Sequence, residues 1–457
     1  MNTAEALPTR KQQANRAGVP PGPKGSLIMG VMREFNRDTL GFVTRCRDYG
    51  AVVHTRFLYV HAYFLYNPSD IESLLTTNAR SYRKAQSLRS PFFHRLVGNG
   101  LVTSEGDFWR RQRRLAQPAF HRQRISSYGD VMVEYTQRAI ASWKHGERRD
   151  LARDMTRLTL EIVVKTLFNS DVSNDADHIG ETLSGLVKPF ASQATLKWIL
   201  DNRLPTPGHR RYFRAVSEID RIVFRIIAER RASGYDEGDL LSMLLQAQDD
   251  DGTQMSDAQL RDEVMTLFLA GHETTALALS WSLYLLATHP EIERKFHAEL
   301  DEVLGGRAPN VSDLPKLKYT EMITKEAMRL YPPAYAVGRE AMEETEIGGY
   351  RVPKGTQLFA FQWVTHRDPR YFDEPDAFRP ERWENSEQPP PKYAYFPFGG
   401  GPRQCIGNYF AMMEIVLLLA TIGQRFRFSL DPAHKVEVLP VLSLRPKNGI
   451  KVIVEER

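Results

Sequence analysis

One apolar stretch, residues 264–287, constrains the fold more than any other part of the sequence. Ser256 and Gln259 form a capping box at the start of a helix that contains this stretch, and Pro290 marks its end. About 33 residues at ~1.5 Å per residue give a helix roughly 50 Å long, which is enough to cross an entire domain. Polar residues 272–275 interrupt the stretch and would be costly in lipid, so the sequence predicts a helix buried in a protein core.

The remaining segments add a smaller β component. Residues 107–300 have a mostly helical pattern, whereas residues 51–66 are rich in Val, Tyr and Phe and predict a pair of strands. Residues 346–364 alternate short β-type runs with glycine turns, and residues 368–402 form an irregular stretch rich in Pro and Gly. The sequence therefore predicts a mainly α fold with a small β-sheet subdomain.

Length and composition predict one large domain. A chain of 457 residues, 42% of them hydrophobic, can bury a core that encloses a sizeable cofactor. We expect an N-terminal tail over residues 1–24 and a single domain over residues 25–457. The N-terminal region has no apolar run of signal or anchor length, so no transmembrane anchor is expected. The net charge of +5 is too mild to indicate a nucleic-acid-binding protein.

Only two cysteines are present, Cys46 and Cys405. They exclude a disulfide framework and a Cys-rich zinc site, and they fit a reducing cytosol, so we expect a cytoplasmic protein. Cys46 is expected to be a free, inert thiol. Cys405 lies in the segment FGGGPRQCIG at the predicted entrance of an apolar helix, where the helix dipole and unpaired N–H groups favour a thiolate. A single such cysteine is more often a buried, inert thiol, and the residues around it decide between these alternatives.

The segment FGGGPRQCIG matches, at every defining position, the haem-binding signature FxxGxRxCxG of the cytochrome P-450 family. Further motifs occur in the family's order, so the resemblance covers the chain from about Pro20 to its end. It implies an α-helical prism that encloses haem b, with Cys405 as the axial ligand of the iron. The signature residues around the cofactor would be Phe398, Gly401, Arg403, Cys405 and Gly407.

A second motif, Glu326 to Arg329, places an acid and a base at i and i+3 on one helix face. Alone it is weak, because such pairs are usually solvated surface ion pairs. The resemblance adds Arg382 from the segment FRPERW and implies a buried, structural network of these three charges.

The polar centre of the long helix is similar to the family's oxygen-activation segment. A carboxylate and a hydroxyl inside an apolar helix are costly unless they serve a purpose, and a threonine hydroxyl can bend a helix by bonding back to a carbonyl. Without the cysteine motif, a satisfied polar cluster at a kink would be favoured. The resemblance implies that Thr274 supports oxygen activation and that Glu273 supplies protons from solvent. We assign His272 and Thr275 to packing or supporting hydrogen bonds.

Four residues match positions from which the family reaches the haem propionates. Trp109 and Arg113 are i,i+4 neighbours and resemble the family's WxxxR element, and Arg403 and Arg339 match the other two positions. Arginine suits this role because its guanidinium group binds a carboxylate with two hydrogen bonds.

The resemblance implies a monooxygenase that inserts one oxygen atom of O2 into a lipophilic fatty acid, terpenoid, steroid or polyketide. The chain has no GxGxxG segment for a dinucleotide, so electrons from NAD(P)H would arrive through a separate ferredoxin or flavodoxin with its reductase. A basic cluster could steer such an acidic partner; it consists of Arg110, Arg111, Arg114 and Arg122. An ordinary solvated surface explains each of these arginines equally well.

The resemblance also places the substrate contacts, most of them apolar: Phe92, Phe93, Leu267, Ala270, Ala334, Val337 and Leu442. Any of these residues could instead belong to the core. Residues 183–212 would form a mobile lid. Two alternatives stay open, a haem-thiolate peroxygenase or isomerase and a haem-based sensor or carrier. Members of the first group typically lack the acid–alcohol pair that Glu273 and Thr274 provide.

Overall fold

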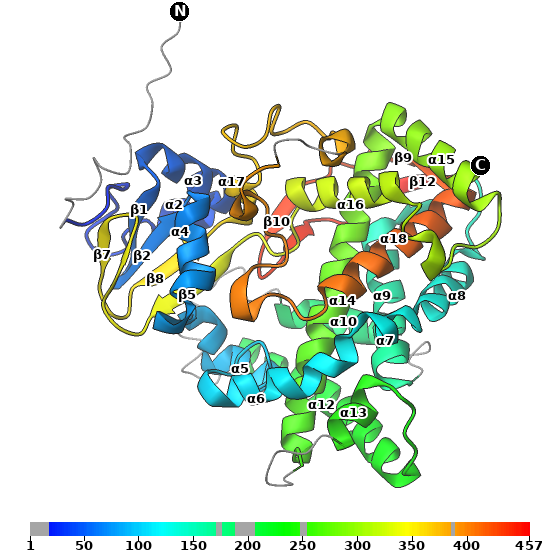
Figure 1. Ribbon diagram of the computed structural model, residues 1–457, viewed down its shortest axis with the longest axis horizontal. Helices are drawn as coiled ribbons and strands as arrows, with labels where there is room; N and C mark the ends of the chain where they lie inside the picture. Colours follow the sequence, from blue (N-terminus) through cyan, green and yellow to red (C-terminus); the bar gives the residue numbers. More distant parts are fainter. Residues whose placement is uncertain (1–17, 171–175, 188–205, 247–253, 385–388) are drawn as a thin grey trace, which may run out of the picture.

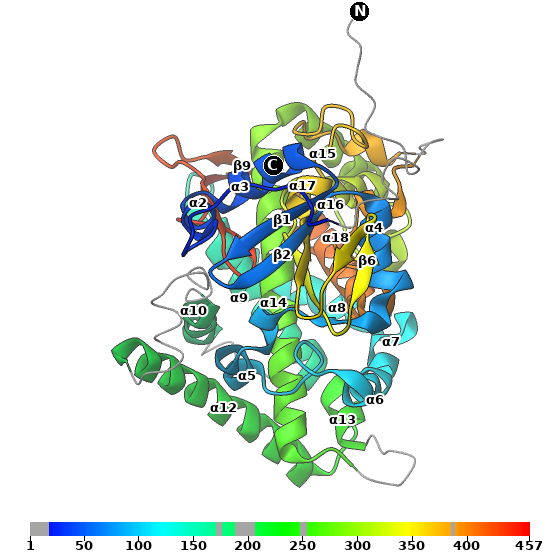
Figure 2. The same ribbon diagram turned by 90° about the vertical axis from the view of Figure 1, so that its left-hand side faces the viewer.

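Helix α14 (Asp257–Thr288) runs through the middle of the molecule (Figures 1 and 2). The computed structural model describes residues 18–170, 176–187, 206–246, 254–384 and 389–457. The capping box of Ser256 and Gln259 is present, and His289 caps the other end of the helix. Both boundaries predicted from the sequence are confirmed. Side chains around the whole circumference of α14 are buried, as expected for a helix that crosses a core.

Other long helices pack directly against α14. They are α9 (Leu151–Phe168), α12 (Pro207–Ser233), α16 (Lys318–Leu330) and α18 (Asn408–Arg425). The remaining described α-helices are α2 (Met32–Arg37), α3 (Thr39–Cys46), α4 (Pro68–Glu72), α5 (Pro91–Val97), α6 (Gly106–Ala116), α7 (Arg122–Ser126), α8 (Gly129–Ile140), α10 (Ala176–Val187), α13 (Leu240–Gln246), α15 (Pro290–Leu304) and α17 (Gln362–Thr365).

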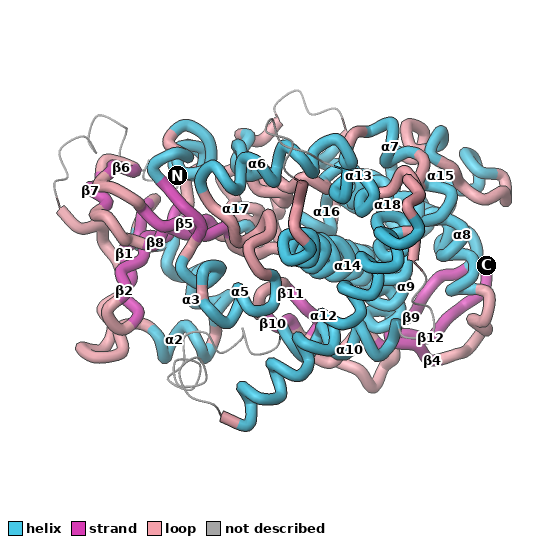
Figure 3. The backbone as a smooth tube through the Cα atoms, turned by 90° about the horizontal axis from the view of Figure 1, so that it is seen from below, coloured by secondary structure: helices cyan, strands magenta, loops and turns pink. Residues whose placement is uncertain are grey.

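A five-stranded sheet of order β1-β2-β8-β5-β3 lies at one end of the molecule (Figure 3). Its strands are β1 (Val52–Phe57), β2 (Val60–Leu65), β3 (Tyr82–Lys84), β5 (Val337–Ala341) and β8 (Gln357–Ala360). The antiparallel pair β1–β2 confirms the strands predicted over residues 51–66. A mainly α fold with a small β subdomain is therefore observed.

Three further sheets are small. Strand β12 (Lys451–Glu456) lies between β4 (Arg148–Asp150) and β9 (Phe426–Leu430), away from the five-stranded sheet (Figure 3). The other two are the hairpins β6 (Thr345–Ile347) with β7 (Tyr350–Val352) and β10 (Val438–Pro440) with β11 (Leu444–Pro446).

One β-type prediction is wrong at its end. Residues 362–365 form the short helix α17, although Trp363, Val364 and Thr365 favour strands. Val364 is 1% exposed and belongs to a separate cluster with residues of α3 and of β1 and β2. This long-range packing outweighs the local preference.

The ends of two predicted segments are clear in the structure. Pro21 accepts a hydrogen bond from the backbone N–H of His54 at 2.9 Å, so contacts to β1 begin within the segment expected as a tail. Most of the expected lid, residues 188–205, lies outside the described residues. Helix α12 begins at the expected Pro–Gly break, with the Thr206 hydroxyl capping it.

None of the described helices is both long enough and apolar enough to cross a bilayer.

Candidate active site

The Cys405 loop joins the irregular C-terminal stretch to α18. A short 3-10 turn, η10 (Gly401–Arg403), precedes Cys405, and α18 starts three residues after it. The Cys405 N–H donates to the Phe398 carbonyl at 3.0 Å, and the Gly407 N–H donates to the Cys405 sulfur. Cys405 is exposed. The loop thus fixes a sulfur atom that a binding partner can reach.

Burial raises the pKa of the Cys405 thiol. The hydrogen bond from Gly407 and the charge of Arg113 act in the opposite direction but do not outweigh burial. A bound iron ion would itself deprotonate the thiol, as metals do with coordinating cysteines.

Gly401 is required by the backbone. Its φ angle is +67°, and a Cβ atom at this position would lie 1.9 Å from the Leu75 carbonyl oxygen. Leu75 belongs to η2 (Ser73–Thr77), a single π-helical turn. Glycine therefore lets the Cys405 loop approach this turn closely.

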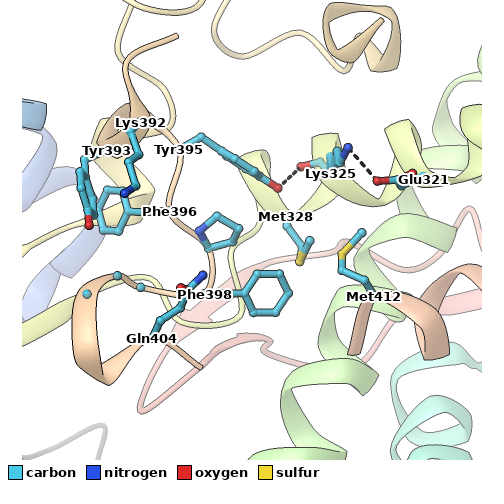
Figure 4. Close-up of a pocket in the computed structure, with 14 residues that line it drawn as sticks. Glu321, Lys325, Met328, Lys392, Tyr393, Tyr395, Phe396, Phe398, Gln404 and Met412 are labelled. Carbon is cyan, nitrogen blue, oxygen red and sulfur yellow. Dashed lines mark hydrogen bonds and ion pairs between the residues drawn. The ribbon is translucent and has the colours of Figure 1, made fainter. Parts of the chain in front are cut away.

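A pocket of about 350 Å³ adjoins the Cys405 loop (Figure 4). Residues 396–401 form one wall, and α16 and Met412 of α18 form the others. The Phe398 ring lies close to Met328 and Met412, and the Tyr395 hydroxyl donates to the Lys325 carbonyl at 3.0 Å (Figure 4). The pocket is lined by neither Cys405 nor Thr274, so it borders the loop outside the space between them.

The four residues expected to bind propionates gather near this loop. The Arg403 guanidinium lies 4.5 Å from the centre of the Trp109 ring, and Arg113 donates to the Gln404 carbonyl at 3.0 Å. Burial, and to a lesser degree the charge of Arg403, lowers the pKa of Arg339 to about 10. The structure thus places Trp109, Arg113, Arg339 and Arg403 around one side of the site.

These cations fit the carboxylates of a haem group. Nη1 of Arg403 is buried and meets no hydrogen-bond acceptor among the described residues. Arg339 is 9% exposed, and its Nη1 donates to the Gly338 carbonyl at 2.9 Å. Buried guanidinium groups that repel one another need anions, and two propionates would supply them.

The sequence did not indicate Lys84 and Glu105, which complete this cluster. Lys84 lies opposite Arg339 in the β3–β5 pair, and its ammonium group donates to the carbonyls of Leu101 and Ser104. Burial, followed by the charge of Arg403, lowers the pKa of Lys84 to about 7. Glu105 accepts hydrogen bonds from Arg403 and from the Lys84 N–H. A lysine in a three-residue strand carries no pattern that predicts these contacts.

A buried charge network centres on the Glu326 carboxylate, which binds both Arg329 and Arg382. Arg329 binds both carboxylate oxygens of Glu326, at 2.8 and 2.9 Å, and Arg382 binds the same carboxylate at 2.8 Å. Glu326 and Arg329 are each 0% exposed. Trp383 also donates to Glu326, and Arg329 reaches the His366 carbonyl. Arg382 and Trp383 lie in the short turn η8 (Pro380–Trp383), so the network ties α16 to the irregular stretch.

The centre of α14 has an open side. Ala270 and Thr274 are exposed although nearly all neighbouring residues of this helix are buried. The Thr274 hydroxyl donates back to the Ala270 carbonyl at 2.7 Å, the arrangement anticipated from the sequence. His272 and Thr275 are each 2% exposed and bond back to carbonyls of α14, consistent with supporting roles.

Glu273 binds the C-terminal hairpin. One of its carboxylate oxygens accepts hydrogen bonds from the Ser443 hydroxyl and from Arg445, whose Nε and Nη2 lie 2.7 and 2.6 Å away. Neither Ser443 nor Arg445 belongs to one of the sequence motifs described above. A signal was available, because Ser443 and Arg445 alternate with Leu442 and Leu444 and so share one face of a strand.

The expected substrate contacts fall into two groups. Phe92, Phe93 and Leu267 are buried in the main core, and the Phe92 ring stacks on Tyr212 of α12 with 3.6 Å between ring centroids. The contacts with open surface are Ala270, Ala334, Val337 and Leu442.

Comparisons with known proteins agree with this geometry. The family model for cytochrome P450 matches residues 20–454. Cyclooctatin synthase of Streptomyces melanosporofaciens is 38% identical over 462 residues, covering 100% of this chain and 99% of the relative. Cyclooctat-9-en-7-ol 5-monooxygenase of the same organism is 37% identical, covering 88% and 87% of the two chains. Pentalenene oxygenase of Streptomyces avermitilis is 33% identical, covering 93% and 94%.

The fold and the cysteine loop describe a haem-thiolate oxidoreductase. With these matches, the chain belongs to the cytochrome P450 family. It is a monooxygenase that uses haem b and O2 and receives electrons from NAD(P)H through redox partners. One oxygen atom enters a lipophilic substrate and the other leaves as water, with two electrons and two protons consumed.

Proposed function

We propose that this enzyme hydroxylates a cyclic terpenoid hydrocarbon or alcohol. The observation that carries the substrate class is the set of relatives, since pentalenene oxygenase and cyclooctat-9-en-7-ol 5-monooxygenase are both similar over most of the chain. Ala270 is exposed on the same face of α14 as Thr274, and an apolar side chain there suits such a substrate. Ala334, Val337 and Leu442 complete the proposed contact surface.

Each residue of the site has a proposed task. Haem b, when bound, supplies the reduction of O2 and the transfer of one oxygen atom to a C–H bond. Cys405 provides the thiolate ligand, and Trp109, Arg113, Arg339 and Arg403 bind the propionates, with Lys84 beside them.

Protons would reach the site along the part of α14 that carries Glu273 and Thr274. The Thr274 hydroxyl holds water near the reacting oxygen, and Glu273 carries protons toward it. Excess protons or poorly placed water would divert electrons to hydrogen peroxide, so the position of these two groups decides how many electrons reach the product.

Substrate binding tests the proposed class. Pentalenene and cyclooctat-9-en-7-ol are titrated into the haem-loaded protein, with palmitic acid and progesterone as comparisons. We expect a low-spin to high-spin shift, and hydroxylated product under turnover, with at least one of the two terpenoids. A shift and product with palmitic acid or progesterone, and with neither terpenoid, would contradict the proposal.

We further propose that an acidic ferredoxin or flavodoxin docks beside the Cys405 loop. Arg110, Arg114 and Arg122 are exposed on α6 and α7, and Arg111 is half-buried. Arg122 lies over the Tyr409 ring of α18, 5.1 Å from its centre, so this basic cluster borders the helix that follows Cys405. Steering by opposite charge would bring the electron donor close to the thiolate.

The proposed setting is the cytoplasm, with residues 25–457 as a single haem domain. Cys46 is 1% exposed and free, which suits a reducing compartment.

A further inference from the structure

An exposed group of apolar side chains lies beside the edge strand β1. The described part of the chain exposes nine large apolar side chains, and four of them form what we call the apolar tip: Leu27, Ile28, Met29 and Tyr59. Leu27 is 95% exposed, and Ile28 and Tyr59 are each 78% exposed. The tip belongs to the end of the molecule where the five-stranded sheet lies (Figure 1).

Backbone hydrogen bonds hold the two parts of the tip together. Ser26 and Gly30 exchange two backbone hydrogen bonds, at 2.9 and 3.0 Å, which close a tight loop. The Leu58 N–H donates to the Met29 carbonyl at 3.3 Å. The loop therefore lies directly against the β1–β2 turn that carries Tyr59.

Arg56 of β1 fixes the same loop from below. Its guanidinium group donates to the carbonyls of Ser26 and Leu27, at 2.6 and 2.8 Å, and also to the Leu58 carbonyl. Gly30 has a φ angle of +60°, and a Cβ atom there would lie 1.7 Å from the Arg56 carbonyl oxygen. The apolar side chains are thus displayed on a built support and not on a loose end.

The surroundings of the tip are basic. Lys24 precedes the loop, Arg33 follows it at the start of α2, and Arg37 lies one helical turn further on; all three are exposed. Glu34 is the one acid in residues 18–37. An apolar tip with a basic surround is complementary to a lipid layer that has anionic headgroups over an apolar interior.

We propose that the apolar tip docks on an anionic lipid surface, with Leu27 and Ile28 inserted among the acyl chains and with Lys24 and Arg33 at the headgroups. A side chain as exposed as Leu27, in a turn, touches little of its own chain and suits a fluid phase better than a shaped protein partner. The ring of Tyr59 suits the headgroup level, where amphipathic aromatic side chains gather. The contact is peripheral and reversible, because few side chains enter the lipid.

This contact would bring the enzyme to a store of its substrate. A cyclic terpenoid is lipophilic and partitions into membranes, so an enzyme at the surface meets it at a raised local concentration. That consequence rests on the proposed function, whereas lipid binding by the tip does not.

Vesicle sedimentation with the haem-loaded full chain tests the proposal. The probes are vesicles of phosphatidylcholine alone and of phosphatidylcholine with an equal amount of phosphatidylglycerol. We expect the wild type to sediment with the anionic vesicles and to be released as salt rises, because salt screens the headgroups. Leu27→Ser/Ile28→Ser should weaken this binding by about tenfold or more, since two inserted side chains are lost.

Tyr235→Ser is the matched control. Tyr235 is 75% exposed, much like the residues of the tip, but it lies just after the end of α12 and outside the tip. Its loss should leave vesicle binding unchanged. The spectrum of the reduced CO complex confirms that every variant is folded and carries haem.

A second variant tests the charges. Lys24→Gln/Arg33→Gln should weaken binding to the anionic vesicles by roughly tenfold or more and leave binding to phosphatidylcholine alone unchanged. The proposal is overturned if the wild type does not bind anionic vesicles, or if Leu27→Ser/Ile28→Ser binds them as well as the wild type.

A second copy of this chain is the main competing occupant of the tip. Light scattering of the lipid-free protein measures the molar mass. If the wild type is a dimer that Leu27→Ser/Ile28→Ser converts to a monomer, and neither protein binds vesicles, the tip is a protein interface and the proposal fails. The spin-state shift with terpenoids is measured without lipid, so failure of vesicle binding and failure of the proposed substrate class are read separately.

Discussion

Thr274 differs from the other threonines of α14 in its surroundings. Thr274 and Thr288 both donate back to a carbonyl four residues earlier, but Thr274 is exposed in the middle of the helix, whereas Thr288 is half-buried at its end. An alcohol held at such a place can organise water for proton transfer.

We predict that Thr274→Ala uncouples the enzyme. The rate of NAD(P)H consumption stays of the same order, while product formed per electron pair falls by roughly tenfold because water is no longer held in place. Product and hydrogen peroxide are measured together. Thr288→Ala is the control and keeps normal coupling. Equal coupling in Thr274→Ala and the wild type would remove Thr274 from the mechanism.

Cys46 shows how burial controls a thiol. It is 1% exposed, and burial raises its pKa to about 12. Because the folded protein disfavours its thiolate, Cys46 stays protonated and unreactive below about pH 11, whereas the unfolded chain would ionise it at its ordinary pKa near 9.0. Iodoacetamide at pH 8 should therefore label Cys46 only after denaturation, as mass spectrometry can show; labelling of the native protein would contradict this.

Single residues also show where the sequence was insufficient. Cys405, Thr274 and the network around Glu326 belong to motifs with defined spacing, so their positions could be predicted. Lys84, Ser443 and Arg445 acquire their partners only through long-range pairing of strands with distant helices. The alternation along one strand places Ser443 and Arg445 on a common face, but it does not identify Glu273 as their partner.

Helix α16 and the turn η8 depend on one another through the Glu326 carboxylate. Arg329, Arg382 and Trp383 all bind this group inside the protein. Removing one partner of such a network leaves an uncompensated charge, which costs far more than losing a surface ion pair.

We predict that Arg329→Met lowers the free energy of unfolding by about 3–5 kcal/mol and the haem content with it. Urea denaturation and the ratio of haem to protein measure the two effects. Glu321→Gln, on the same helix, breaks the exposed pair with Lys325 and should change stability by less than about 1 kcal/mol. Similar losses in both variants would argue against a special role for the buried network.

Elements with strong local signals were predictable. Helix α14 has a capping box and a terminating proline, and β1 and β2 are dense in β-favouring residues. Helix α17 was not predictable, because Trp363 and Val364 prefer strands and are held in a helical turn by packing. The hairpin of β10 and β11 is so short that its position depends on its anchors at Trp281 and Tyr335.

At the scale of the whole molecule, the proposed docking surface for the electron donor lies beside the Cys405 loop. The basic cluster on α6 and α7 predicts that reduction by an acidic ferredoxin slows as ionic strength rises, because salt screens exposed charges. The double variant Arg114→Gln/Arg122→Gln should raise the KM for ferredoxin roughly three- to tenfold at low salt with little change in kcat.

Arg294→Gln serves as the control for this surface. Arg294 is exposed on α15 and pairs with Glu291, and its loss should leave the KM for ferredoxin unchanged. If the double variant and the control behave alike, the donor docks elsewhere.

The central claim is that Cys405, as a thiolate, binds the iron of a haem held by this fold. The visible spectrum of the dithionite-reduced protein, with and without carbon monoxide, tests it most directly, because a thiolate opposite CO gives a strongly red-shifted Soret band. We predict that this band is present in the wild type and absent in Cys405→Ala. A CO band of the histidine-ligated type, or a protein that binds no haem, would contradict the account.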